Sequence, residues 1–224
     1  MSDRVIDILL NSFGQIIVPG ILVTIPLTLI SFALALVIAT LTALVQFANI
    51  RVLKQLARVY IWIMRGTPLL VQLYVVFYGL PDLGIVLDPF PAAVIVFSLN
   101  TGAYASETIR AAIESVPAGQ FEAAQCVGLT YGQTMRRIIL PQALRTAFPP
   151  LSNELIALVK DTSLAANITV AEMLMATQRI VSRTYEALPL YLEVGAIYLL
   201  FSTLLTLAQR AGEKRLAAYG MERS

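Results

Sequence analysis

The sequence of 224 residues contains no histidine, a single cysteine and few charged side chains. Without histidine, His-based acid–base catalysis and His metal sites are excluded, and Cys126 alone makes neither a disulfide nor a CxxC pair. Only 13% of the residues are charged, against roughly 25% in soluble domains. The net charge of +2 is too small to indicate a nucleic-acid partner. The mean hydropathy of +0.76 indicates that the chain lies in a lipid bilayer. With no histidine and one cysteine, the chain is expected to bind no metal.

Apolar stretches divide the chain into five predicted membrane spans, since a spanning helix needs about 20 apolar residues. No charged residue lies between Asp7 and Arg51, so we expect a short interfacial lead-in to about Phe13 and then one long or tilted helix. A pair of tight hairpin spans is the alternative. The predicted spans are about 16–45, 59–80, 90–108, 155–178 and 188–208. Together they predict an all-α membrane protein with a single transmembrane domain over residues 1–224.

Lysine and arginine are distributed unequally between the two predicted sides of the membrane. Twelve lie on one side: Arg51, Lys54, Arg58, Arg65, Arg110, Arg136, Arg137, Arg145, Arg210, Lys214, Arg215 and Arg223. Three lie on the other: Arg4, Arg179 and Arg183. Because cytoplasmic loops carry the excess of basic residues, the C-terminus is expected in the cytoplasm and the N-terminus outside.

The long segment between the third and fourth spans, about 110–150, carries signals for two short cytoplasmic helices. The first is expected over 121–127 and ends at Gly128, as a C-terminal glycine would end it. The second starts near Thr130 and covers 134–140, and Pro141 lies in its last turn or opens the next element. Within this segment Cys126 is expected to be a buried small hydrophobic residue.

The pattern of this segment is specific. Glu122, Ala123 and Ala124 are followed after three residues by Gly128, and nine residues later by Ile138 to Pro141. This spacing resembles the EAA loop of ABC-importer permeases, in which the loop forms coupling helices that dock on a cytoplasmic ATPase. The resemblance assigns ATPase coupling to Glu122, Ala123, Ala124, Gly128, Ile138, Leu140 and Pro141. A partnerless amphipathic hairpin at the membrane surface is the alternative.

Three further motifs resemble the polar amino-acid branch of these permeases: RGTPLLVQ at 65–72, NTGAY at 100–104 and KDTSL at 160–164. Within that branch, segments 78–81, 87–89 and 99–101 look most like permeases for L-cystine. The resemblance implies the type I importer (MetI-like) fold, with five transmembrane helices and a coupling segment between spans three and four. It also implies the bacterial cytoplasmic (inner) membrane.

No phosphate-binding G-x-x-x-x-G-K-[ST] loop is present, so the chain is not expected to hydrolyse ATP itself. The resemblance implies a transport subunit that is not an enzyme and holds no cofactor, with ATP and Mg bound by a partner. The implied partners are two cytoplasmic ATPase subunits, an extracytoplasmic amino-acid-binding protein, and a second permease, either the same chain or a paralogue.

Polar side chains within the spans are candidates for the substrate path, because polar groups at depth normally face a bundle interior or a water-filled path. Those predicted to line it are Thr67, Asn100, Tyr104, Glu154, Asp161, Thr162 and Ser163. Glu154 and Asp161 share one helix face and suit the ammonium group of an amino acid.

Several alternatives remain open at these positions. Lys160 paired with Asp161 or Glu154 would be a structural ion pair, or a relay in a carrier driven by an ion gradient. Tyr104 suits an interfacial aromatic, and Glu107 suits a partner for Arg110. The acidic pair would also accept arginine, lysine or histidine in place of cystine.

Overall fold

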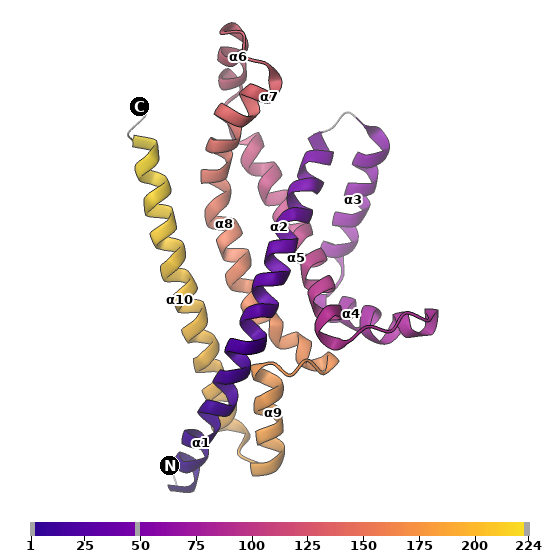
Figure 1. Ribbon diagram of the computed structural model, residues 1–224, viewed down its shortest axis with the longest axis vertical. Coiled ribbons are helices and arrows are strands. Elements are labelled where there is room, and N and C mark those ends of the chain that lie inside the picture. The colour runs from indigo at the N-terminus through magenta and orange to yellow at the C-terminus, as the bar shows by residue number, and fades with distance from the viewer. Residues whose placement is uncertain (1–2, 48–49, 222–224) are drawn as a thin grey trace.

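The computed structural model describes residues 3–47 and 50–221, which are helical along nearly their whole length (Figure 1). This confirms the all-α class. Arg223, counted among the basic residues, lies outside the described range, as do the first two residues of the predicted domain. By length and composition, helical runs over 3–47 and 187–216 suit a membrane span, and a bent pair of helices forms a third candidate.

The first span is one helical run. It consists of α1 (Asp3–Pro19), a π-helical turn η1 (Gly20–Thr24) and α2 (Ile25–Phe47). Pro19 and Pro26 flank this turn, and each removes a backbone hydrogen bond that a regular helix would make. The wider π turn accommodates the loss without breaking the helix. The prediction of one long helix is therefore confirmed, and the lead-in to Phe13 is part of it.

The second span, predicted over about 59–80, is broken near its middle and is not one continuous helix. Helix α3 (Arg51–Gly66) and the segment that starts with α4 (Leu69–Tyr74) are bent by 107°. Pro68 has no N–H, and its ring forces Thr67 into the extended conformation, with φ −121° and ψ 147°. After α4 the chain continues through η2 (Val75–Gly79) and η3 (Leu80–Leu83), and Figure 1 shows this arm reaching sideways.

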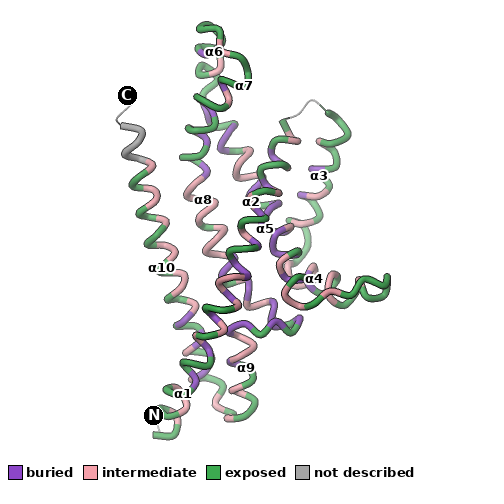
Figure 2. Tube along the Cα trace, in the orientation of Figure 1, coloured by how far each residue is buried: buried purple, intermediate pink, exposed green. Residues whose placement is uncertain are grey.

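Helix α5 (Pro89–Glu114) lies at the centre of the fold and extends the predicted third span, 90–108, at its C-terminal end. It packs along α2, and small side chains permit the close approach. A Cβ at Gly102 would lie 3.0 Å from Ile38 Cγ2 and 3.2 Å from the Tyr60 hydroxyl. Figure 2 shows buried residues along α2 and α5, whereas α3 and the α6–α7 tip are mostly exposed.

The coupling segment runs directly into the fourth membrane helix. Its elements are α6 (Ala118–Cys126), α7 (Tyr131–Thr134), the π turn η4 (Met135–Ile139) and α8 (Leu140–Asp161). The second short helix predicted to end at Leu140 does not end there, which is a correction. Pro141 lies in the first turn of α8, where its missing N–H is tolerated.

Helix α8 ends at Asp161, so the predicted span over 155–178 is not one helix. Thr162 Oγ1 donates to the Val159 carbonyl at 2.6 Å, and Ser163 Oγ to that of Lys160 at 2.7 Å. Such side-chain bonds compete with the helical ladder. The chain continues as the 3₁₀-helix η5 (Thr162–Ile168) and then turns back into α9 (Met173–Thr184).

The last helix, α10 (Ala187–Met221), is longer than the span predicted over 188–208. It packs on α8, α1 and α9. Gly20 lies against this junction, where an added Cβ would meet Met173 Sδ at 2.7 Å and Phe201 Cε2 at 3.0 Å. The C-terminal end of α10 lies at the same end of the molecule as α6 and α7, and the N-terminus lies at the opposite end (Figure 1).

Candidate functional site

The α6–α7 tip has a sharply defined joint. Gly128 has φ +75°, and its N–H donates to Gln125 O at 3.0 Å while the Leu129 N–H donates to Ala124 O at 3.0 Å. A residue with a Cβ is strained in this conformation. Thr130 then forms a capping box with Gln133, which starts α7 as the sequence predicted. The glycine and the cap together fix the angle between α6 and α7.

The outer surface of the α6–α7 tip is exposed to solvent. It includes two apolar side chains that the sequence analysis did not single out. Val127 is 74% exposed and Tyr131 is 70% exposed. Glu122 and Ala123 are exposed beside them, whereas Ala124 is buried. Cys126 is also exposed, so the expectation that it is buried was wrong: its small size does not decide which face of α6 it occupies.

The other predicted coupling residues divide between the base and the surface. Ile139 is fully buried, in a cluster with Ile113 and Val116, and Ile138 packs against that cluster. These contacts seat the tip on the ends of α5 and α8. Leu140 and Pro141 are exposed at the start of α8. Of the coupling set, Glu122, Ala123, Gly128, Leu140 and Pro141 therefore face outward.

A polar network holds the break between α3 and α4. Pro68 cannot donate to the Met64 carbonyl, and two side chains donate in its place: Asn100 Nδ2 at 3.0 Å and Gln72 Nε2 at 2.9 Å. Asn100 also donates to Gln72 Oε1 at 3.0 Å, and Gln72 donates to Thr67 Oγ1 at 2.8 Å. Two predicted path residues, Thr67 and Asn100, are thus brought together. Gln72 was not singled out from the sequence, although it lies in the RGTPLLVQ motif.

One turn further along α5, the ring of Tyr104 packs against the guanidinium group of Arg65. The Arg65 guanidinium carbon lies 5.1 Å from the centroid of the Tyr104 ring, within the range of a cation–π contact. Tyr104 is 37% exposed. Arg65 was counted with a cytoplasmic loop, but it lies in the last turn of α3, beside the break.

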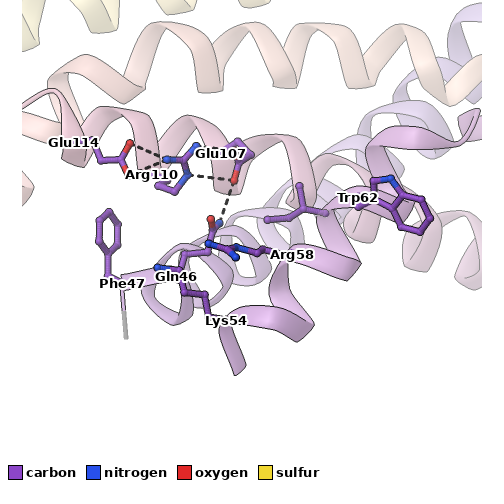
Figure 3. A pocket seen from close by; sticks show the side chains of 9 residues that line it. Gln46, Phe47, Lys54, Arg58, Trp62, Glu107, Arg110 and Glu114 are labelled. Atoms are coloured by element: carbon purple, nitrogen blue, oxygen red, sulfur yellow. Dashed lines mark hydrogen bonds and ion pairs between the residues drawn. The ribbon is translucent and has the colours of Figure 1, made fainter. Parts of the chain in front are cut away.

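Next to the contact between Arg65 and Tyr104, a cleft of about 550 Å³ lies among the ends of α2 and α5 and the start of α3 (Figure 3). Arg110 lies on its wall and binds Glu107 at 2.9 Å and Glu114 at 2.8 Å, so the expected pairing with Glu107 is present. These hydrogen bonds raise the pKa of Arg110, which lies beyond the predicted third span. Lys54 and Arg58 face the same cleft.

The predicted path residues on α8 lie in different surroundings. Glu154 and Asp161 are half-buried. Thr162 is fully buried and donates to the backbone, and Ser163 also donates to the backbone. In the part of the chain that the structure describes, no ion pair within 4.0 Å joins Lys160 to Asp161 or Glu154. The ion-pair interpretation is therefore not supported within one chain.

A buried carboxyl group at the start of α9 was missed by the sequence analysis. Glu172 is fully buried and caps α9, where its Oε1 accepts from the Met175 N–H at 2.8 Å. Its Oε2 accepts from the Tyr198 hydroxyl on α10 at 2.5 Å. A helix N-cap signal is local, but the Tyr198 donor lies 26 residues away and no sequence pattern indicates it.

Comparison with known proteins decides the family. Residues 35–218 match the family described as the binding-protein-dependent transport system inner membrane component. The chain belongs to this family. It is 49% identical to the L-cystine transport system permease protein TcyB of Bacillus subtilis (strain 168), over 95% of this chain and 92% of that protein.

Solved structures agree with this assignment. A structure described as an amino acid ABC transporter with histidines has a TM-score of 0.87 at 32% identity, covering 92% of this chain and 96% of that chain. The inward-facing MetNI methionine ABC transporter shares the fold alone, with a TM-score of 0.69 at 17% identity, covering 96% of this chain and 99% of that chain. The MetI-like fold expected from the sequence is confirmed.

The family settles several expectations. The protein is an amino-acid permease subunit of an ABC importer in the bacterial inner membrane, and it works with an ATPase partner. It is a transport subunit, and ATP hydrolysis belongs to that partner. The alternative of a carrier driven by an ion gradient is not favoured.

Proposed function

We propose that this chain couples ATP hydrolysis by two cytoplasmic ATPase subunits to amino-acid import through its α6–α7 tip. The observation that carries the proposal is the joint at Gly128, which holds an exposed apolar and acidic surface at a fixed angle. Glu122 offers a carboxylate for an arginine or a helix end on the ATPase. Because Ile139 seats the tip on α5 and α8, motion of the tip moves the membrane helices rigidly. ATP and Mg are bound by the ATPase partner.

The same proposal places the substrate path between this chain and a second permease subunit, either an identical chain or a paralogue. The predicted path residues are Thr67, Asn100, Tyr104, Glu154, Asp161, Thr162 and Ser163. An extracytoplasmic amino-acid-binding protein delivers the substrate to the outer end. Thr162 contributes to the shape of the path through the end of α8, since its hydroxyl is occupied.

The orientation follows from the excess of basic residues on one side. Leaving out Arg65, which lies at the far end of α3 beside the break, leaves eleven basic residues against three, and the asymmetry remains. The C-terminal end of α2, the N-terminal end of α3, the α6–α7 tip and the C-terminal end of α10 lie toward the same end of the molecule (Figure 1). We therefore place the C-terminus in the cytoplasm and the N-terminus outside.

L-cystine is the proposed substrate. The support is the identity of 49% to an L-cystine permease, together with the segments at 78–81, 87–89 and 99–101. Cystine carries ammonium groups that suit Glu154 and Asp161. The same carboxylates would accept arginine, lysine or histidine, which are the alternatives.

ATPase measurements on the complete complex test this function. The permease, its ATPase and the binding protein are reconstituted, and the hydrolysis rate is measured with L-cystine and with a panel of other polar amino acids. L-cystine should stimulate hydrolysis more than any other. If only arginine, lysine or histidine stimulated hydrolysis, the substrate would be a cationic amino acid and the proposal of L-cystine would be wrong. A rate indifferent to every amino acid would contradict the coupling proposal.

A further inference from the structure

Arg65 is a charged side chain in the last turn of α3, next to the break that lies within the predicted second membrane span. Six residues of that span, 59–64, precede it, or roughly 9 Å of helix at 1.5 Å per residue. An ionisable group at such depth is costly and normally serves a substrate path or a partner charge. A cavity of about 350 Å³ opens beside it, lined by Ile61, Trp62, Gly66 and Tyr104 as well as Arg65.

The guanidinium is held in place without a hydrogen bond to a carboxylate. Its carboxylate contact is Glu107 Oε2 at 3.9 Å, too long for a hydrogen bond. Glu107 is already bound by Arg110 at 2.9 Å and by Gln46 at 3.1 Å. Within the described residues no hydrogen bond uses the N–H groups of Arg65, and its side chain remains 44% exposed.

The helix dipole alone could explain why an arginine lies at the end of α3, but it does not explain where the guanidinium group lies. A cation in the last turn of α3 interacts favourably with the helix dipole. That effect does not require the guanidinium to lie over the Tyr104 ring or beside a cavity. Gly66 has no atom within 4 Å of where a Cβ would be, so this side of the cavity is open to a ligand.

The guanidinium fork matches a carboxylate with two parallel hydrogen bonds, which the single point charge of lysine does not reproduce. We propose that Arg65, seated on Tyr104, binds the α-carboxylate of the transported amino acid. The proposal rests on the proposed function. Arg65 would bind the negatively charged carboxylate of the substrate. Glu154 and Asp161 are themselves negatively charged and can bind only its ammonium group. Tyr104 is a positioning residue in this arrangement.

Direct ligand binding to the permease–ATPase complex in nanodiscs, without binding protein and without nucleotide, tests the assignment. The probes are L-cystine, L-arginine and L-glutamine, each compared with its α-carboxamide. The wild-type complex should prefer the carboxylate form of whichever probe binds. Arg65→Met should reduce that preference at least tenfold by weakening the carboxylate form alone, and Arg65→Lys should reduce it partly. Tyr104→Phe should keep the preference, and Tyr104→Leu should lower it.

Arg51→Met is the matched control, since Arg51 is an exposed arginine at the other end of α3, and it should leave binding unchanged. Co-elution with the ATPase and the basal ATPase rate show that each variant is assembled. If Arg65→Met binds both forms as the wild type does, or weakens both equally, the carboxylate site is refuted. If the wild-type complex binds none of the probes, the proposed function fails and the Arg65 site fails with it. If it binds a carboxylate and its amide equally, only the Arg65 site fails.

Discussion

Asn100 on α5 donates a hydrogen bond of 3.0 Å to the carbonyl oxygen of Met64 on α3. In a continuous helix this oxygen would accept from residue 68, which is a proline here and has no N–H. A side chain from a neighbouring helix thus replaces the backbone bond that the break removes. The bend of 107° is therefore part of the packed structure, and the arm that begins with α4 is held at a defined angle.

Replacing Asn100 with leucine should weaken this junction. The substitution keeps the number and branching of the side-chain heavy atoms but removes one donor from Met64 O and one from Gln72 Oε1. Met64 O retains the donor from Gln72, whereas the part-buried Gln72 Oε1 is left without a partner. We therefore expect a loss of about 1–2 kcal/mol in the free energy of unfolding. Thermal unfolding followed by the fluorescence of Trp62, the single tryptophan, measures it.

Ser98→Ala is the control for this substitution. Ser98 is buried on the same helix, but its hydroxyl donates within α5, to Val94 O at 2.6 Å. Its loss should cost less than Asn100→Leu. Equal effects of the two substitutions would show that the bridge between α5 and α3 has no particular role.

Gly128 and Gly132 provide a matched pair at the coupling tip. Gly128 has φ +75°, whereas Gly132 lies in α7 with no positive φ and open space around it. Gly128→Ala should destabilise the tip by about 1–2 kcal/mol, because a Cβ is disfavoured in the left-handed region. Gly132→Ala should be neutral or slightly stabilising. Affinity for the ATPase, measured by biolayer interferometry, should fall only for the Gly128 variant. A fall for both variants would show that the left-handed conformation of Gly128 is not what ATPase binding requires.

Cys126 offers a direct probe of docking, since it is the single thiol of the chain and is exposed on α6. A maleimide should label it quickly in the isolated permease and slowly once the ATPase is bound. In intact cells, only a membrane-permeant maleimide should reach it. Rapid labelling from outside would reverse the proposed orientation. Equal rates with and without the ATPase would place the docking surface away from α6.

The Glu172–Tyr198 contact should show up as non-additive stability changes. Glu172→Met and Tyr198→Phe each remove the same hydrogen bond of 2.5 Å between α9 and α10, since neither new side chain can make it. The double variant should therefore lose about 1–2 kcal/mol less than the sum of the single losses. Tyr191→Phe, with a half-exposed ring on α10, is the control. Strict additivity of Glu172→Met and Tyr198→Phe would mean that the bond contributes nothing to stability.

The parts of the structure that the sequence predicted are those governed by local signals. The turn at Gly128 and the start of α7 at Thr130 each depend on a few adjacent residues, and both are present. Pro141 was ambiguous because proline both ends helices and opens them. The continuation into α8 depends on the π turn at Met135–Ile139, for which the sequence carries no distinct signal.

The site was harder to predict because its contacts join distant segments. Thr67 and Asn100 were selected as polar residues at depth, but their link through Gln72 depends on how α3, α4 and α5 pack. The motif around Arg65 was recognised, yet its seat on Tyr104 is visible only in three dimensions. The burial of Glu172 likewise depends on Tyr198 of another helix.

Uptake into proteoliposomes that hold the permease and its ATPase tests the central claim most directly. Labelled L-cystine and the binding protein are supplied on the side of the N-terminus, with ATP on the side of the α6–α7 tip. The account predicts uptake that requires ATP, persists when ionophores dissipate every ion gradient, and is abolished by Gly128→Trp. Uptake that continues without ATP and stops with the ionophores would contradict it.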